Sequence, residues 1–134
     1  MTELIDPSLE KSSAFVAASG LELESWSGTE VRGHVDAGAG HHTPWGMVHG
    51  GVYASVIETA CSFGASLAVL EDGRFAVGLT NTTEFVRAHR EGRLDVVATP
   101  LHQGRTGQLW QCDVTREDGK LVARGQVRLQ NVDR

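Results

Sequence analysis

The chain has 134 residues, enough for one hydrophobic core but not for two domains with a cleft between them. Its composition, 40% apolar and 22% charged, is not that of a disordered protein, and its net charge of −5 argues against non-specific binding to nucleic acid. Residues 1–83 carry 3 Lys/Arg and 10 Asp/Glu, whereas residues 84–134 carry 9 Lys/Arg and 7 Asp/Glu. We therefore expect a single domain over residues 1–134 whose C-terminal part receives any anionic ligand.

The first residues, MTELIDPSLE, have neither the basic region nor the apolar region of a signal peptide. No apolar run approaches the ~20 residues that a membrane-spanning helix needs. The two cysteines, Cys61 and Cys112, are too few for a disulfide framework and lie in apolar segments. The sequence thus predicts a cytoplasmic protein without membrane contact, whose thiols are buried and reduced.

A short helix is predicted first in chain order. Residues 8–18 have helical apolar spacing, and Gly20 is suited to end the helix. We expect this N-terminal helical segment, within residues 1–20, to pack through one apolar stripe made of Leu9, Phe15, Val16 and Ala18.

Two strands are predicted next. Residues 21–26 and 29–36 alternate between apolar and polar side chains, and Ser27-Gly28 between them is a turn signal. This pattern indicates a β-hairpin with one face exposed to solvent.

A long helix follows a loop rich in Gly and His at residues 37–49. Residues 50–70 lose the alternation and show helical spacing, which predicts a helix of about 20 residues and roughly 30 Å. Gly73 is suited to end this helix. Because the helix is apolar nearly all round, we expect it to be buried on most sides, with a second subunit covering what the sheet leaves open.

The rest of the chain is predicted to form β-strands. They are predicted at residues 74–90, 93–103, 107–118 and 120–131. The last alternates cleanly between one apolar side and another that carries Arg124 and Arg128, and Asp118-Gly119 is a typical hairpin turn. The order of elements predicts an α+β fold with one antiparallel sheet of five or six strands wrapped around a central helix.

Glu58 is the only charged residue in the predicted helix. On a helical wheel it shares one side with small residues, and the opposite side is expected to face the sheet. The first side holds Gly51, Ala54, Ser55, Glu58, Ser62 and Ala65, and the second holds Val52, Val56, Thr59, Ala60, Phe63 and Leu67. Ser62 lies one turn after Glu58 on the same face. A lone acid on a stripe of small residues favours a functional carboxylate over a solvated surface acid.

Gly50 and Gly51 stand at the predicted start of the helix. A helix N-terminus presents unpaired N–H groups and the positive end of the helix dipole, and glycine lets a substrate oxygen approach these donors closely. The pair therefore indicates an oxyanion hole built from backbone, two turns before Glu58.

The three histidines His41, His42 and His49 match no usual zinc spacing, and no cysteine or carboxylate lies near them in sequence. We expect neither a metal nor a cofactor, and we interpret His49 as a structural or active-site loop residue. The sequence contains no phosphate-binding loop, no dinucleotide fingerprint and no serine nucleophile elbow.

The segments GMVHGGVYASVIETACS, NTTEFVR, GRTGQLWQ and VARGQVRLQN resemble hotdog-fold acyl-CoA thioesterases. The resemblance is strongest to the branch with the phenylacetate-pathway thioesterases and the Arthrobacter-type 4-hydroxybenzoyl-CoA thioesterase, and it covers nearly the whole chain beyond the first ~20 residues. It implies a long helix wrapped by an antiparallel sheet, homodimers that pair into homotetramers, and active sites at the dimer interface. It also implies an acyl-CoA substrate, of which CoA is a part, so that no cofactor is needed.

The resemblance assigns roles to individual residues. It implies that Glu58 is the catalytic carboxylate, that the Gly50 N–H polarises the thioester carbonyl, and that the Ser62 hydroxyl helps to hold the attacking water. It further implies that Arg87 meets the nucleotide phosphate of CoA. Arg105 and Thr106 match another segment that contacts CoA.

The chain departs from the family at Thr43, where a Gln or Asn that contacts the thioester is usual, six residues before His49. Either His42 takes over this contact or the contact is missing. Whether Glu58 attacks the carbonyl directly or deprotonates water is left open. The resemblance favours an aryl or medium-chain acyl group.

Two other functions are compatible with the same fold. One is a dehydratase or hydratase, although the Asp and His spacing and the proline-rich His loop typical of those enzymes are missing. The other is a non-catalytic acyl-CoA-binding protein, an alternative that the departure at Thr43 leaves open.

Overall fold

The computed structural model describes residues 13–134. The helix predicted at residues 8–18 is observed as α1 (Ala14–Ser19), and residues 8–12 of the prediction lie outside the described residues. Helix α1 is capped at its N-terminus by the Ser13 hydroxyl, which accepts a hydrogen bond from the Val16 N–H, and at its C-terminus by Gly20. Val16 packs against the core, but Phe15 is 72% exposed and Ala18 is also exposed, so the predicted stripe was wrong at Phe15 and Ala18. Leu9 lies outside the described residues. The elements are α1 (Ala14–Ser19), β1 (Glu22–Trp26), β2 (Val31–Ala37), the 3-10 helix η2 (Ala39–His41), α2 (Gly50–Val69), the 3-10 helix η3 (Leu70–Asp72), β3 (Arg74–Phe85), β4 (Gly92–Gln103), β5 (Gly107–Arg116) and β6 (Leu121–Asp133).

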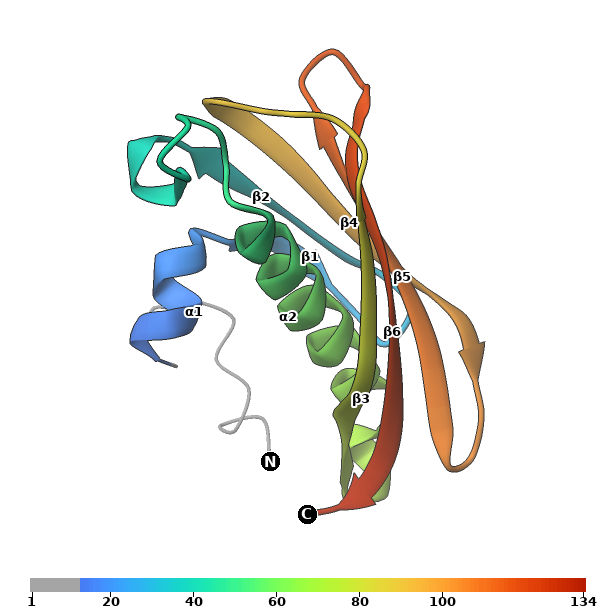
Figure 1. Cartoon of the computed structure of the whole chain (residues 1–134). Coiled ribbons are helices and arrows are strands. Elements are labelled where there is room, and N and C mark those ends of the chain that lie inside the picture. Colours follow the sequence, from blue (N-terminus) through green and yellow to red (C-terminus); the bar gives the residue numbers. More distant parts are fainter. Residues whose placement is uncertain (1–12) are drawn as a thin grey trace.

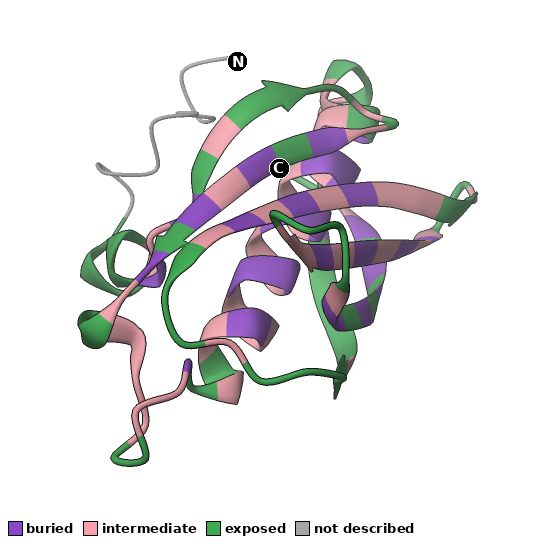
Figure 2. Ribbon diagram, turned by 90° about the horizontal axis from the view of Figure 1, so that it is seen from above, coloured by how far each residue is buried: buried purple, intermediate pink, exposed green. Residues whose placement is uncertain are grey.

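The six strands form one antiparallel sheet in the order β1-β2-β4-β5-β6-β3, and the sheet curves around α2 (Figure 1). Along the central strands, buried residues alternate with more exposed ones, because one face of the sheet packs on α2 while the other meets solvent (Figure 2). The predicted α+β fold with a central helix and an antiparallel sheet is therefore confirmed.

Helix α2 approaches the sheet closely where its side chains are smallest. A Cβ added to Gly64 would lie 2.5 Å from Cη2 of Trp110, a fully buried side chain of β5. The buried face of the helix consists of Tyr53, Val56, Ile57, Ala60, Cys61, Gly64, Ala65 and Val69. Val56 and Ala60 were predicted on this face, but Ala65 was placed on the other. The helical wheel assigned the wrong face of the helix to the sheet, because this helix packs through glycine and alanine as much as through its large side chains.

By length and composition, α2 and η3 together (residues 50–72) would be long and apolar enough to cross a membrane, which corrects the expectation that no such run exists. In the structure this helix packs against β3, β4, β5 and β6, and part of its surface is buried in the core. Packing of this kind identifies it as the core helix of the domain.

A network of buried amides fixes the loop between β4 and β5. The Asn131 side chain, 8% exposed, donates to the carbonyls of Gly104 (3.1 Å) and Arg105 (3.2 Å). Its oxygen accepts from Nε2 of Gln108 at 2.8 Å, and Gln108 also donates to the Ala65 carbonyl at 2.9 Å. The loop is therefore tied both to β6 and to the central helix.

We expect Gly64→Ala to destabilise the protein. An alanine inside a helix normally gains roughly 1 kcal/mol over glycine, but here the new methyl group collides with the Trp110 ring, and overpacking of a core costs about 1–3 kcal/mol. Urea unfolding measures the change. The matched control is Gly40→Ala, whose Cβ meets no described atom within 4 Å. An unchanged or increased free energy of unfolding for Gly64→Ala would contradict the close approach of helix and sheet.

We expect Asn131→Ala to lower the free energy of unfolding by about 1–3 kcal/mol, because the Gly104 carbonyl loses its donor and one N–H of the buried Gln108 amide loses its acceptor. Amide hydrogen exchange of residues 104–106 should speed up as well. The exposed neighbour Gln130→Ala is the control and should leave both readouts unchanged. Equal effects of the two substitutions would show that the network does not hold the loop.

Candidate active site

The Glu58 carboxylate points from α2 toward the edge strand β3. Its Oε1 accepts a hydrogen bond from Nδ2 of Asn81 at 3.1 Å. The same Nδ2 donates to the Ala54 carbonyl at 3.1 Å, and the Thr83 hydroxyl donates to Oδ1 of Asn81 at 2.7 Å. The amide is thereby oriented with its NH₂ group toward Glu58, so the carboxylate is held on a defined side of the helix.

Gly78 provides the space for this carboxylate. A Cβ at Gly78 would overlap Oε2 of Glu58, so any larger residue would displace the acid. The pairing of β3 with β6 shifts register between Gly78 and Thr80, as in a β-bulge. Bulges are common beside active sites because they redirect side chains. Glu58 is half-buried here, at the border of the packed face, and not on the free face that the wheel indicated.

Ser62 lies one turn after Glu58, and its hydroxyl donates to the Glu58 backbone carbonyl at 2.8 Å. The hydroxyl proton is therefore engaged within the helix. The lone pairs of the oxygen stay available to accept a hydrogen bond, for example from a water molecule beside the carboxylate.

At the start of α2, His49 is the N-cap, and its Nδ1 accepts from the Gly51 N–H at 2.8 Å. The neutral ring therefore carries its proton on Nε2. Among the described residues no acceptor is found for the Gly50 N–H, which makes Gly50 the open donor of the glycine pair. The Phe85 ring lies against Gly50, since a Cβ there would be 2.8 Å from its Cε2 and Cζ atoms.

Thr43 and His42 belong to the loop before the helix. The Thr43 hydroxyl accepts from the Trp45 N–H at 3.2 Å and so supports a tight turn. Nε2 of His42 donates to the Arg90 carbonyl at 2.5 Å, which leaves Nδ1 of the neutral ring as an acceptor. Both side chains hold the loop that precedes Gly50.

A cleft of about 380 Å³ opens between α1, this loop and the first turns of α2. Its lining combines apolar side chains with hydroxyls and imidazoles, and consists of Phe15, Ala18, Ser19, Gly40, His41, His42, His49, Gly51, Val52 and Ser55. It lies next to the Gly50 donor through His49 and Gly51.

The three predicted CoA contacts do not lie together in one chain. Arg87 follows β3, and its Nη1 donates to the carbonyl of Leu121, the first residue of β6, at 2.7 Å. Arg105 and Thr106 lie at the other end of β6, where Asn131 binds their carbonyls. Nine residues of strand separate the two ends, roughly 30 Å at the usual rise per residue.

Three other ionisable groups, on α2 and on the strand β5 beneath it, are excluded as bases or nucleophiles. Burial raises the pKa of Tyr53 to about 12, so its hydroxyl stays protonated. Cys61 and Cys112 are buried free thiols, and the hydrogen bond between them, with burial, raises the pKa of Cys112 well above its usual value. Glu58 is thus the group suited to this role on the described face of α2 that meets β3.

Sequence reasoning missed three residues of the site: Gly78, Asn81 and Phe85. Asn81 stands in the quoted segment NTTEFVR, but its contact with Glu58 joins residues 23 positions apart and needs the pairing of helix and strand. The predicted roles of Glu58, Gly50, Ser62, His49, Thr43, Gly51, Arg87, Arg105, Thr106 and His42 stay predictions.

Comparison with known proteins places the chain among thioesterases. The sequence signature described as "Thioesterase superfamily" matches residues 46–123. A protein of Mycobacterium tuberculosis, Rv1847/MT1895, named as a candidate esterase, is 46% identical over 91 residues, which are 66% of this chain and 64% of that protein, just under two thirds of its length. The proofreading thioesterase EntH of Cronobacter sakazakii is 35% identical over 59% of this chain and 57% of its own length.

Solved structures agree with the sequence matches. The structure of Rv1847/MT1895 superimposes with a TM-score of 0.87 at 37% identity, covering 91% of this chain and 98% of that one. Thioesterase HI1161 from Haemophilus influenzae superimposes with a TM-score of 0.84 at 30% identity, covering 91% of this chain and 85% of that one. With the family signature over more than half of its length, this chain belongs to the thioesterase superfamily and has the hotdog fold.

Proposed function

We propose that the protein is an acyl-CoA thioesterase that hydrolyses the thioester to a free acid and CoA. The observation that supports this proposal is a pair of groups on α2. The Glu58 carboxylate is held beside Gly78 of the edge strand β3, and the Gly50 N–H at the start of the helix has no acceptor among the described residues. A base or nucleophile and an oxyanion donor are the two groups that hydrolysis of a thioester requires.

The Gly50 N–H and the Glu58 carboxylate of the same chain cannot act together on one carbonyl group. Gly50 and Glu58 are eight residues apart on one helix, which separates them by about 12 Å along the axis. An oxyanion donor has to lie ~3 Å from the carbonyl oxygen, and the attacking group close to the carbon. The active site therefore combines Gly50 of one chain with Glu58 of a second copy.

The edge strand β3 is the surface on which a second copy fits. It ends the sheet, and its exposed apolar side chains are Phe75, Val77, Leu79 and Phe85. A long exposed apolar edge is normally covered, and antiparallel pairing of two identical edges gives a two-fold dimer. Glu58 lies beside this edge, so a dimer formed there brings the acid to the interface. The dimers pair into a homotetramer in this proposal.

In the reaction, the carbonyl oxygen accepts a hydrogen bond from the Gly50 N–H, and the helix dipole stabilises the developing negative charge. Glu58 either takes a proton from a water that attacks the carbonyl carbon or attacks that carbon itself to form an anhydride, which water then hydrolyses. The Ser62 oxygen accepts a hydrogen bond from the water. Breakdown of the tetrahedral intermediate expels the CoA thiolate. In the first route the thiolate takes up the proton that Glu58 removed from the water, and in the second it takes up the proton released when water hydrolyses the anhydride.

The acyl group occupies the cleft beside Gly51 and His49. A lining that mixes Phe15 and Val52 with Ser55 and imidazoles suits an aryl or medium-chain acyl group, and aryl groups with a hydroxyl in particular. The CoA phosphates are bound by Arg87 of one chain and by Arg105 and Thr106 of the other, because one chain holds these residues at opposite ends of β6. The protein acts in the cytoplasm, where its buried thiols stay reduced.

We expect Glu58→Gln to lower kcat by ~10²–10⁴, because a positioned base or nucleophile contributes this much. A thiol-release assay with aryl, short, medium and long acyl-CoA measures it, and circular dichroism checks the fold. Glu84→Gln, an exposed acid of the same edge strand, is the control and should keep most of the activity. A loss below tenfold for Glu58→Gln would remove Glu58 from the mechanism.

The Gly50 N–H is tested by comparing two substitutions. Gly50→Ala and Gly50→Pro both add a Cβ that presses on Phe85, but only proline removes the N–H. Proline is tolerated at the first helical position, and His49 already has the extended backbone that it requires. We expect Gly50→Pro to have a kcat lower than that of Gly50→Ala by ~10²–10³. Equal rates would exclude this N–H as the oxyanion donor.

Refolding Glu58→Gln and Gly50→Pro chains together tests the two-chain site. A mixed dimer contains one site with both groups intact, so an equimolar mixture should regain about a quarter of wild-type activity, since half of the dimers are mixed and each has one active site of two. No gain over the separate variants would mean that both groups act within one chain.

A non-catalytic acyl-CoA-binding protein is the second candidate, because the Thr43 hydroxyl supports a turn where the family carries an amide for the thioester. Calorimetric binding of acyl-CoA without release of free thiol by the wild-type protein would decide for it.

A further inference from the structure

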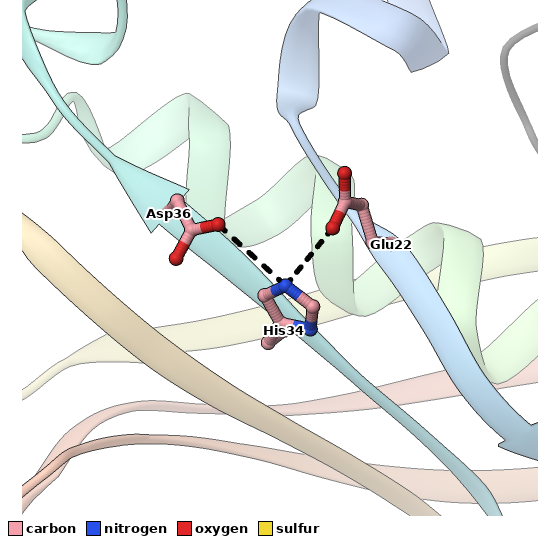
Figure 3. Close-up of side chains that lie close together, drawn as sticks. All are labelled: Glu22, His34 and Asp36. Carbon is pink, nitrogen blue, oxygen red and sulfur yellow. Dashed lines mark ion pairs between the residues drawn. The ribbon is translucent and has the colours of Figure 1, made fainter.

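A second group of chemically reactive side chains lies on the outer face of the sheet, far from Glu58. Glu22 and Glu24 on β1 surround His34 on β2, together with Asp36 of the same strand (Figure 3 shows His34 with Glu22 and Asp36). Glu22 is paired directly with His34 in the sheet register. Strand β1 ends the sheet on the side opposite to β3, so this group is separate from the proposed active site.

Both nitrogens of the His34 ring face carboxylates. Nδ1 lies 2.6 Å from Oε1 of Glu24, and Nε2 lies 2.9 Å from Oε2 of Glu22 and 3.6 Å from Oδ2 of Asp36. The His34 side chain is 15% exposed, whereas Glu22 and Asp36 are 67% and 75% exposed. The ring is thus fixed and the two carboxylates can adjust around it.

A neutral imidazole has only one N–H. When Nδ1 donates it to Glu24, the lone pair of Nε2 is directed at two further carboxylate groups, which repel it. A cation between Nε2, Glu22 and Asp36 removes this repulsion. Arg93 does not provide it, because its guanidinium binds Glu24 at 2.6 Å and Asp95 at 3.0 Å.

The 2.9 Å between Nε2 and Oε2 of Glu22 is the length of an N–H···O hydrogen bond, and the distances within the whole group also accommodate a metal ion. Zinc bonds of about 2.0–2.1 Å at the tetrahedral angle separate neighbouring ligand atoms by about 3.3 Å. The two Nε2–oxygen distances, 2.9 and 3.6 Å, lie on either side of that value. All three ligand atoms lie within 4.8 Å of one another.

We propose that Glu22, His34 and Asp36 form a binding site for a divalent transition-metal ion of the zinc type. Glu24 completes the site from outside the ligand set, because a carboxylate on the second nitrogen orients a metal-binding imidazole and makes it more basic. An imidazole with two carboxylates suits zinc better than magnesium or calcium, which prefer oxygen alone. Water fills the remaining coordination positions.

The metal site links the two strands at this edge of the sheet. Its ligands come from both strands of the hairpin, so a bound ion holds β1 to β2 and stabilises the folded chain by mass action. Because it lies at the opposite edge from β3, the metal site is separate from Glu58 and from the dimer proposed there.

The test is calorimetry of the full-length protein without a tag, freed of metal with EDTA, and titrated with ZnCl₂. We expect one zinc ion per chain, a higher Tm with zinc, and reversal by EDTA. His34→Gln should weaken binding at least tenfold, and Glu24→Gln by about 10–100-fold because it removes only the outer carboxylate. His42→Gln and His102→Gln, which alter histidines outside this group, are the controls and should bind zinc as the wild type does.

A second variant tests the same site in case His34→Gln fails to fold. The double substitution Glu22→Gln with Asp36→Asn keeps the ring and should also bind zinc at least tenfold more weakly. Absorption of bound Co²⁺ should lack sulfur charge transfer, which excludes binding by Cys61 or Cys112. The proposal is overturned if the wild type shows no saturable zinc binding, or if binding persists unchanged in His34→Gln or in the double variant. Strand pairing by a protonated His34 alone would then explain the cluster.

Discussion

The constraint on which the structure depends is the close approach of α2 to the sheet. Gly64 leaves no room for a side chain between the helix and the Trp110 ring, and Gly125 of β6 similarly accommodates Ile57. Glycine at these two contacts allows the long helix to pack closely against the concave face of the curved sheet. One side of the helix is then left at the edge strand β3, and Glu58 reaches Gly78 and Asn81 there. The position of the acid is therefore a consequence of how the core packs.

A straight helix also limits what one chain can do. The open N–H at its start and the carboxylate two turns further on point at places about 12 Å apart. The proposed contacts for CoA show the same division, since Arg87 and Arg105 lie at opposite ends of β6. Catalysis and oligomer formation are thus linked in our proposal, because each site needs parts of two chains.

Much of the fold could be predicted from the sequence because its signals are local. The start of α2 at Gly50, the turn at Asp118-Gly119 and the alternation along β6 depend on neighbouring residues alone. The face of α2 could not be predicted, because Gly, Ala and Ser give little contrast on a wheel. The buried Gly64 and Ala65 were therefore missed.

The candidate site was predictable in part for the same reason. Glu58 stands out in sequence as the single charge of an apolar helix. Its partner Asn81, the space at Gly78 and the ring of Phe85 over Gly50 depend on contacts between distant segments. The same holds for the cluster around His34, since alternation predicts its outward direction but only the register of β1 and β2 places Glu22 opposite it.

The central claim is that one thioester is bound by two chains. A crystal structure of the protein with a non-hydrolysable thioester analogue of an aryl-CoA tests it most directly. We predict that the carbonyl oxygen of the analogue, or the atom in its place, lies within hydrogen-bond distance of the Gly50 nitrogen of one chain and that the adjacent carbon faces the Glu58 carboxylate of the other. A complex in which one chain supplies both groups, or in which neither group meets the analogue, would contradict the account.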